Sequence, residues 1–192
     1  MLVEVAVRRL RAAPGHPLVV DVGTGSGCIA LSLARECPAA VVYATDISAD
    51  ALAVARGNAG RLGMDGLVSF RQGDLCGALD AELSGKIDLI VCNPPYIREG
   101  DFPSLPPEVR EHEPYISLVA GPEGTEIHLR LMEQALLWLA PCGRMLVEGG
   151  EDQVTALARA ALAMGYGEAE VHPDLTGRPR MVETGVSPPH ST

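Results

Sequence analysis

Two periods of apolar and polar positions alternate along most of this 192-residue chain. Short continuous apolar runs predict buried strands, and between them apolar residues recur at helical spacing. The predicted strands are Leu18–Val22, Val41–Thr45, Leu67–Arg71, Ile87–Cys92, Gly143–Glu148, Gly167–His172 and Arg180–Glu183. The predicted helices are Met1–Arg11, Cys28–Arg35, Ala49–Leu62, a repeat from Ile127 to Leu139 and another from Val154 to Leu162. This alternation indicates an α/β fold whose mainly parallel sheet is covered on both faces.

The last two predicted strands are separated only by the loop Asp174–Pro179, which predicts an antiparallel hairpin. Together with the five earlier strands, the hairpin gives an expected seven-stranded, mostly parallel sheet. A chain of this length is suited to one domain with a sizeable core.

One stretch, from Ile97 to Pro122, has no clear periodicity and is rich in proline and acidic residues. Irregular stretches of this length in a compact domain are usually functional or disordered. Because it directly follows a turn with candidate chemistry, we expect it to form a flap over a substrate.

The charge balance is acidic, with 15 basic and 25 acidic residues and a formal net charge of −10. Nucleic-acid affinity depends largely on lysine and arginine side chains that neutralise phosphates. The balance therefore argues against a large surface that binds nucleic acid directly, although a local basic patch is compatible with it.

The five cysteines are scattered, without a C-x-x-C pair, at Cys28, Cys37, Cys76, Cys92 and Cys142. This pattern predicts small buried thiols in a reducing compartment and no zinc site. The start of the chain is too charged for a signal peptide. No apolar run approaches the roughly 20 residues that a membrane span needs. We therefore expect a cytoplasmic protein that does not contact membranes.

Polar residues and glycines stand where the predicted strands end. A glycine-rich turn follows the first strand, Asp46 ends the second, Asp74 follows the third and Asn93 the fourth. In a doubly wound sheet, ligands bind at the carboxyl ends of the strands, where an acidic residue can accept both ribose hydroxyls. An alternative for Asp74 is that it caps a turn.

The spacing of the glycines distinguishes two cofactors. A dinucleotide-binding turn requires G-x-G-x-x-G, but Cys28 occupies the position of its third glycine. The turn instead reads G-x-G-x-G through Gly23, Gly25 and Gly27, preceded by Asp21. That form is expected for S-adenosylmethionine, which has no pyrophosphate to hold.

The most informative motif is Asn93-Pro94-Pro95-Tyr96, directly after a predicted strand. An amide or exocyclic amine is a poor nucleophile, because its lone pair is delocalised. An enzyme that alkylates it must hold its N–H groups with acceptors and aim the lone pair at the electrophile. The Asn93 side-chain carbonyl and a proline carbonyl supply acceptors, the prolines stiffen the backbone and Tyr96 offers a flat face. The motif predicts methylation of a planar nitrogen.

Several segments together resemble the catalytic domain of the PrmC/HemK family. These bacterial methyltransferases modify the glutamine of the Gly-Gly-Gln motif in peptide chain release factors. The similarity runs from about Leu2 to Glu183 and rests on Asp21 to Leu31, Thr45 to Ser48, Asn58-Ala59, Gly73 to Leu75, Asn93 to Ile97, Glu108-Val109, Glu113-Pro114, Gly121 to Gly124, Glu148-x-Gly150-x-x-Gln153 and Asp174 to Arg180.

The resemblance implies a class I S-adenosylmethionine-dependent methyltransferase with a Rossmann-like fold. It implies that Asn93, Pro94, Pro95 and Tyr96 hold the glutamine amide and that no metal is needed. The expected reaction is in-line methyl transfer to the amide nitrogen without a dedicated base, giving N5-methylglutamine and S-adenosylhomocysteine. The implied cofactor-binding residues are Asp21, Gly23, Thr24, Gly25, Ser26, Gly27, Asp46, Ile47, Asp74, Leu75 and Asn93.

Two features depart from the family pattern. Family members carry an N-terminal helical domain, and here only a last helix corresponds to it, so the chain is expected to be a fragment, a truncated product or a stand-alone relative. Gly149 and Val154 also differ from the usual residues of a supporting turn. The expected organisation is a helical stub or linker at 1–13, a catalytic domain at 14–186 and a disordered tail at 187–192.

Three alternatives remain open on sequence grounds. The substrate glutamine could belong to a ribosomal protein. The enzyme could instead methylate adenine N6 in nucleic acid, which would require base flipping and phosphate contacts. Finally, the fold could serve as a non-catalytic binding module. The intact Asp46 and the intact Asn93 motif argue against this alternative.

Overall fold

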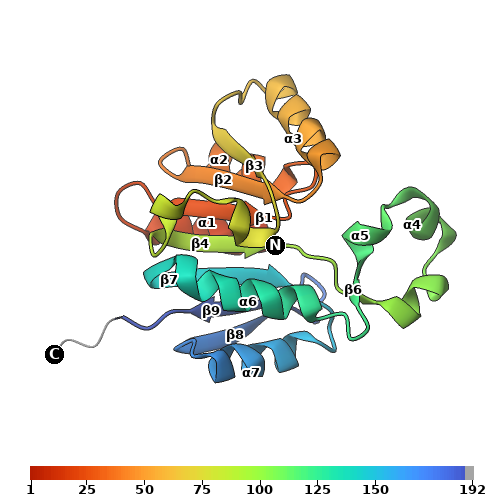
Figure 1. The fold of residues 1–192 in the computed structure, drawn as a ribbon. Helices are drawn as coiled ribbons and strands as arrows, with labels where there is room; N and C mark the ends of the chain where they lie inside the picture. Colours follow the sequence, from red (N-terminus) through yellow and green to blue (C-terminus); the bar gives the residue numbers. More distant parts are fainter. Residues whose placement is uncertain (189–192) are drawn as a thin grey trace.

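The computed structural model describes residues 1–188 (Figure 1). Ser187 and Pro188, the first two residues of the predicted tail, are described as coil, and the rest of that tail lies outside the described residues. Across residues 1–188, every helix is too short or too polar to cross a lipid bilayer.

The centre of the molecule is a seven-stranded sheet with the strand order β3-β2-β1-β4-β7-β9-β8. Neighbours from β3 to β7 run parallel, whereas β9 is antiparallel to both β7 and β8. The strands are β1 Leu18–Val22, β2 Val41–Asp46, β3 Val68–Gln72, β4 Ile87–Cys92, β7 Leu139–Glu148, β8 Glu168–Pro173 and β9 Pro179–Gly185. The predicted sheet with its C-terminal antiparallel hairpin is confirmed.

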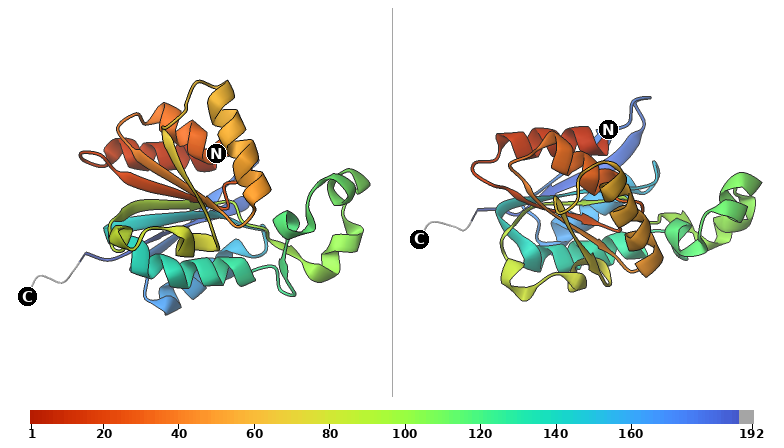
Figure 2. Two further views of the ribbon diagram at one scale, coloured as in Figure 1. Left: turned by 45° about the horizontal axis from the view of Figure 1, so that its top comes forward. Right: turned by 90° about the horizontal axis from the view of Figure 1, so that it is seen from above.

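Helices cover both faces of this sheet, as the view from above shows most clearly (Figure 2). One face packs against α1 Leu2–Ala12, α2 Cys28–Glu36 and α3 Ala49–Arg61. The other packs against α6 Glu126–Trp138, α7 Val154–Met164 and the 3-10 helices η1 Leu75–Ala78 and η2 Ala81–Leu83. Burial on both faces explains why the central strands read as continuous apolar runs.

The register of the central strands brings the candidate residues to one edge. Val22 pairs with Thr45 on one side and with Cys92 on the other, and Cys92 pairs with Val147. The residues that follow β1, β2 and β4 therefore leave the sheet side by side. This carboxyl edge, at the strand order reversal between β1 and β4, is where open α/β sheets bind ligands.

The stretch expected to be irregular, Ile97 to Pro122, is more ordered than the sequence predicted. It contains β5 Ile97–Arg98, η3 Glu99–Ser104, α4 Pro107–His112, α5 Tyr115–Leu118 and β6 Val119–Gly121. We call this segment, residues 97–121, the flap. It projects from the body in every view, and β5 and β6 pair in parallel at its base (Figures 1 and 2). Prolines keep its helices short, because Pro107 can only begin a helix and Pro114 cannot continue one.

Strand β7 begins at Leu139, four residues before the predicted start at Gly143. Leu139 pairs with Ile87, and the register then shifts before Leu89 pairs with Arg144. Cys142 within this irregularity has a φ of 65°, which is rare for a residue other than glycine. The prediction missed the extension because the irregular part interrupts the apolar pattern.

Helix α1 packs directly on the sheet. Its apolar positions Leu2, Val5, Ala6 and Leu10 are buried in the same core as β1, β2 and β4. Arg9 on this helix also pairs with Glu183 of β9. The division of the chain at residue 13 stays a prediction.

Candidate functional site

The turn after β1 crosses over the end of β2. The Gly23 and Thr24 N–H groups both donate to the Thr45 carbonyl, at 2.8 and 2.9 Å. Gly23 and Gly25 have φ values of +70° and +55°, which glycine adopts without strain. A Cβ built on either residue has nothing within 4 Å, so this side of the backbone faces open space. A ligand can therefore approach the turn closely.

Gly27 has a different role in the same turn. Its φ is +82°, and a Cβ there would lie 3.1 Å from the Ala55 Cβ and 3.3 Å from a Leu31 methyl carbon. Close packing of the turn against α3 thus requires glycine at this position. The Asn58 amide of α3 donates to the Ser26 carbonyl at 2.8 Å, which holds the turn from the same side.

Asp21 lies at the base of the turn and is fully buried. Its Oδ2 accepts hydrogen bonds from the Thr24 hydroxyl at 2.6 Å and from the Ala30 N–H at 3.0 Å. Burial raises the pKa of Asp21 to about 6, although these two hydrogen bonds oppose the shift. The other oxygen, Oδ1, is buried without a partner. A buried carboxylate atom with no donor is costly and indicates a site that a further donor or cation would complete.

Asp46 ends β2 and links two neighbouring segments. Its Oδ2 accepts from the Gly25 N–H at 2.8 Å and its Oδ1 from the Ser48 N–H at 2.9 Å. An ionised carboxylate has about four acceptor positions, so both oxygens keep capacity for hydroxyl donors. Ile47, the next residue, is 54% exposed at this edge and offers an apolar surface for a planar ring.

Asp74 and Leu75 follow β3 on the far side of β2. The Asp74 carboxylate forms an ion pair with Arg130 of α6, so it is already engaged in this structure. Asp74 stands at the N-cap of η1 and its backbone carbonyl accepts from the Gly77 N–H, but its side chain makes no capping hydrogen bond. Leu75 has a φ of 51°, a left-handed conformation that costs free energy in a branched residue and tends to occur at functional sites.

The Asn93-Pro94-Pro95-Tyr96 turn begins directly beyond β4, beside the glycine turn that follows β1. The Asn93 side chain is exposed at the strand end, Pro94 is buried and Tyr96 is half-buried. The Tyr96 carbonyl accepts a hydrogen bond from the Gln153 side chain at 2.9 Å. The turn therefore places Asn93 at the carboxyl edge of the sheet, which we call the ligand edge. The other end of the turn is anchored at the Tyr96 carbonyl.

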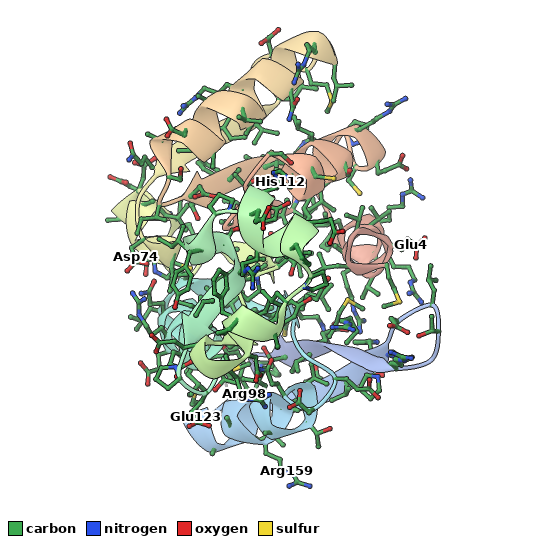
Figure 3. The ribbon with its side chains drawn as sticks, turned by 90° about the vertical axis from the view of Figure 1, so that its right-hand side faces the viewer. Glu4, Asp74, Arg98, His112, Glu123 and Arg159 are labelled. Carbon is green, nitrogen blue, oxygen red and sulfur yellow. The ribbon has the colours of Figure 1, made fainter. Side chains whose placement is uncertain are left out.

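The flap stands in front of this edge when the molecule is viewed from its right-hand side, with Asp74 beside it (Figure 3). Arg98 at the base of the flap pairs with Asp152 in the turn between β7 and α7. Phe102 and Tyr115 meet edge to face within the flap, with ring centroids 4.8 Å apart. The flap thus has a small apolar contact of its own and a fixed base beside the Tyr96 end of the turn.

The chain is similar to known proteins. Residues 4–104 match the family described as "Methyltransferase small domain". The chain belongs to this family. It is 42% identical to the release factor glutamine methyltransferase of Deinococcus radiodurans and 43% identical to that of Moorella thermoacetica. Each alignment covers 94% of this chain and 62% of the relative, so the chain spans about three fifths of the length of these relatives.

A solved structure is also similar to this chain. The release-factor-specific protein-(glutamine-N5) methyltransferase of Alicyclobacillus acidocaldarius is 28% identical, with a TM-score of 0.57. The similarity covers 97% of this chain and 90% of that one. The expected resemblance to the glutamine methyltransferases and the class I methyltransferase fold are confirmed by these comparisons.

The structure brings the residues predicted from the sequence to four neighbouring strand ends, which carry Asp74, Asp46, the glycine turn and the Asn93 turn in that order. The Gly73 N–H donates to the Asp46 carbonyl at 3.0 Å, and the Asp74 carboxylate is paired with Arg130. Their roles toward a cofactor or substrate stay predictions. Sequence reasoning assigned no role to Gln153, although it stood in the segment Glu148-x-Gly150-x-x-Gln153.

A second polar cluster lies on the β8–β9 hairpin, away from the glycine turn. Glu170, His172 and Glu183 have potential metal-ligating atoms within 4.8 Å of one another. However, Glu183 already accepts from the Arg9 guanidinium at 2.7 Å and from Arg144 at 3.0 Å. Two guanidinium groups on one carboxylate repel an added cation, so we read this cluster as an ion-pair network that holds α1 on the sheet.

Proposed function

We propose that this chain transfers a methyl group from S-adenosylmethionine to the side-chain amide nitrogen of a glutamine in a protein. The observation that carries the proposal is the position of Asn93. It follows β4 directly, beside the glycine turn after β1, because Cys92 and Val22 pair in the register of the sheet. A group that aligns an amide nitrogen therefore lies next to a turn that suits the cofactor.

The residues present fit S-adenosylmethionine. The glycine turn is open at Gly23 and Gly25, Asp46 keeps acceptor capacity for two hydroxyls, and buried Asp21 has an oxygen without a donor. Ile47 and Leu75 offer apolar surface near the same edge, where an adenine would lie. When bound, this cofactor supplies an electrophilic methyl group on a positively charged sulfur. The acidic groups around the turn complement that positive charge.

The Asn93-Pro94-Pro95-Tyr96 turn would orient the amide. The Asn93 side-chain oxygen and the Pro94 carbonyl each accept one N–H of the substrate amide, which turns its lone pair toward the methyl group. The prolines fix the backbone dihedral φ, so the two acceptors keep their spacing. Tyr96 packs against the plane of the amide. The methyl group that the cofactor supplies would bond to the amide nitrogen, leaving S-adenosylhomocysteine, and that nitrogen would release its proton to water.

The proposed substrate is the Gly-Gly-Gln glutamine of peptide chain release factors. The names of the curated relatives and of the Alicyclobacillus structure support this choice. Release factors act on the ribosome, so the proposal places the protein in the cytoplasm. All five cysteines are free thiols, which is consistent with a reducing compartment. Cys37, Cys76 and Cys92 are buried as predicted, whereas Cys28 and Cys142 are exposed, so the prediction of burial was wrong for these two.

The test is to incubate the chain with S-adenosylmethionine and a bacterial release factor, and then to measure the mass of its Gly-Gly-Gln peptide. The release factor with Gln→Ala at that position is the control. A methyl gain on the wild-type peptide that is lost in the control is the expected result. A sample that binds the cofactor and gives no gain on release factor would overturn the assignment of this substrate.

A further inference from the structure

The side chain of Gln153 connects the two ends of the flap to the body. It lies in the turn between β7 and α7 and is 4% exposed. Its Nε2 donates to the Tyr96 carbonyl at 2.9 Å and to the Gly124 carbonyl at 3.3 Å. Its Oε1 accepts from the Gly150 N–H at 2.9 Å. Tyr96 precedes the flap and Gly124 follows it, so one amide group holds both ends.

The partners of Gln153 fix which way its amide points. The Tyr96 and Gly124 carbonyls can only accept, and the Gly150 N–H can only donate. The NH₂ group must therefore face the two carbonyls and the oxygen must face Gly150. With this orientation the two N–H groups and the oxygen are all used, which is the condition under which a buried amide stabilises its surroundings.

The site around this amide is tightly built. Gly124 has a φ of +75°, and a Cβ there would lie 2.6 Å from both the Gln153 Nε2 and the Tyr96 oxygen. Real Cβ atoms do not approach that closely, so any larger residue at position 124 would force the Gln153 contact apart. The arrangement depends on glycine at 124 as well as on the amide at 153.

The Asn93–Tyr96 turn needs such an external anchor. Proline has no N–H, so Pro94 and Pro95 cannot donate hydrogen bonds that would fasten the turn to its neighbours. The nearby Arg98–Asp152 ion pair is a weaker fastening, because its side chains are 40% and 63% exposed and solvent screens the charges. The hydrogen bond from the buried Gln153 amide to the partly buried Tyr96 carbonyl is therefore the stronger anchor at this end of the turn.

We propose that Gln153 is a positioning residue for methyl transfer, which holds the Asn93–Tyr96 turn and the base of the flap in the productive geometry. The inference rests on the proposed function. Gln153 is buried and its amide is fully used by backbone groups, so it acts through the Tyr96 carbonyl. A displacement of about 1 Å at a reacting centre can cost about a hundredfold in rate. A shift of the turn should therefore lower kcat far more than cofactor affinity.

The kinetic test compares Gln153→Ala and Gln153→Glu with the wild type and with Glu151→Gln, an exposed position in the same turn. We expect kcat to fall by about 10- to 100-fold in both Gln153 variants, with cofactor Kd within about twofold of the wild type. The Glu151→Gln control should match the wild type. Turnover within about twofold of the wild type in a Gln153→Ala variant would overturn the proposal.

The Gln153→Glu variant adds a readout that a general loss of stability would not produce. Glutamate keeps the shape and can still accept from Gly150, but its ionised form places an oxygen against two carbonyl oxygens. Protonation restores one donor, so its kcat relative to the wild type should rise as the pH falls. The Gln153→Ala variant has no proton to regain, and its relative kcat should stay constant. Equal pH profiles in the two variants would count against the anchoring hydrogen bond.

Amide hydrogen exchange tests the anchor without any assay of activity. In the Gln153→Ala variant, exchange should accelerate in the peptides that span residues 96–98 and 119–125, while the β1 and β4 peptides stay as protected as in the wild type. Uniform acceleration across the fold, or no change at the flap ends, would overturn the proposal. If the wild type itself fails to methylate the release factor, the substrate assignment fails, and exchange alone decides the anchoring role.

Discussion

The Asp46 carboxylate accepts a hydrogen bond from the Gly25 N–H at 2.8 Å, which joins the acidic end of β2 to the glycine turn after β1. Its other oxygen accepts from the Ser48 N–H, at the residue that caps α3. A single side chain thus orders the turn and the start of the next helix, and also points its remaining acceptor capacity toward the ligand edge.

Replacing Asp46 with alanine should weaken the binding of S-adenosylmethionine by about 1–3 kcal/mol, the range for losing a hydrogen-bonded charged partner. Titration calorimetry with the cofactor or with S-adenosylhomocysteine measures the change. Asp46→Asn is the matched variant, because it keeps the shape and one acceptor oxygen and should lose less. Unchanged affinity in Asp46→Ala would remove this residue from the site.

The Asn93→Ala variant should lose methyl transfer by about two to three orders of magnitude and keep most of its cofactor affinity. The reason is that Asn93 would act on the amide that is methylated, whereas the glycine turn and Asp46 would hold the cofactor. The measurement is single-turnover methylation of the release factor together with cofactor Kd. Near-normal turnover would refute the role of Asn93 in orienting the lone pair.

The buried Asp21 predicts a pH dependence of cofactor binding. Because burial raises the pKa of Asp21 to about 6, the free protein carries a proton on this group below that pH. A cationic cofactor favours the ionised form, so its affinity should be constant above about pH 6 and fall as the pH drops below it. Calorimetry at a series of pH values measures this. The Asp21→Asn variant should show no such fall, and an identical fall in both proteins would exclude Asp21 as the cause.

Glu183 predicts a pH dependence of folding stability. Burial acts to raise its pKa, but the hydrogen bond and charge of Arg9, with help from His172 and Arg144, outweigh burial and lower the pKa below its ordinary value of 4.5. A lowered carboxyl pKa stabilises the fold fully above the unfolded-state value, and this stabilisation is lost as the pH falls through the folded-state value.

Glu183→Gln should therefore lower the free energy of unfolding at neutral pH by about 1–3 kcal/mol. The effect should not be larger, because the Arg9 side chain is partly exposed and solvent screens its charge. The difference in free energy of unfolding from the wild type should narrow as the pH falls below the ordinary carboxyl value of 4.5 and Glu183 becomes protonated. Urea unfolding at neutral and acidic pH measures both values. A gap that stays the same at every pH would show that shape and packing, rather than charge, set the contribution of Glu183.

Much of the body could be predicted from the sequence because its signals are local. Continuous apolar runs such as Ile87–Cys92 mark strands buried on two faces, and the predicted bounds of β4 match the observed ones. The ligand edge followed from the same runs, since parallel strands end at a common edge. Each candidate residue that ends or directly follows a strand, such as Asp46 or Asn93, could be placed at that edge without further information.

The features that the sequence did not reveal depend on contacts between distant segments or on single backbone angles. The pairing of Asp74 with Arg130 joins residues 56 apart in the chain, and Gln153 meets Tyr96 across 57 residues. The left-handed conformation of Leu75 could not be predicted from the sequence, because leucine rarely adopts it and its presence therefore does not indicate a positive φ. The helices of the flap, at four to six residues, are too short for apolar periodicity to detect.

The parallel pairing of β5 with β6 means that the flap leaves and re-enters the body at nearly the same place. A segment attached in this way behaves as a cassette, because its interior can change in length or sequence without moving the elements that flank it. Residues 99–118 could then be exchanged between relatives while the Asn93 turn and the glycine turn keep their positions. Sequence changes within the flap would then leave the residues at the strand ends in place.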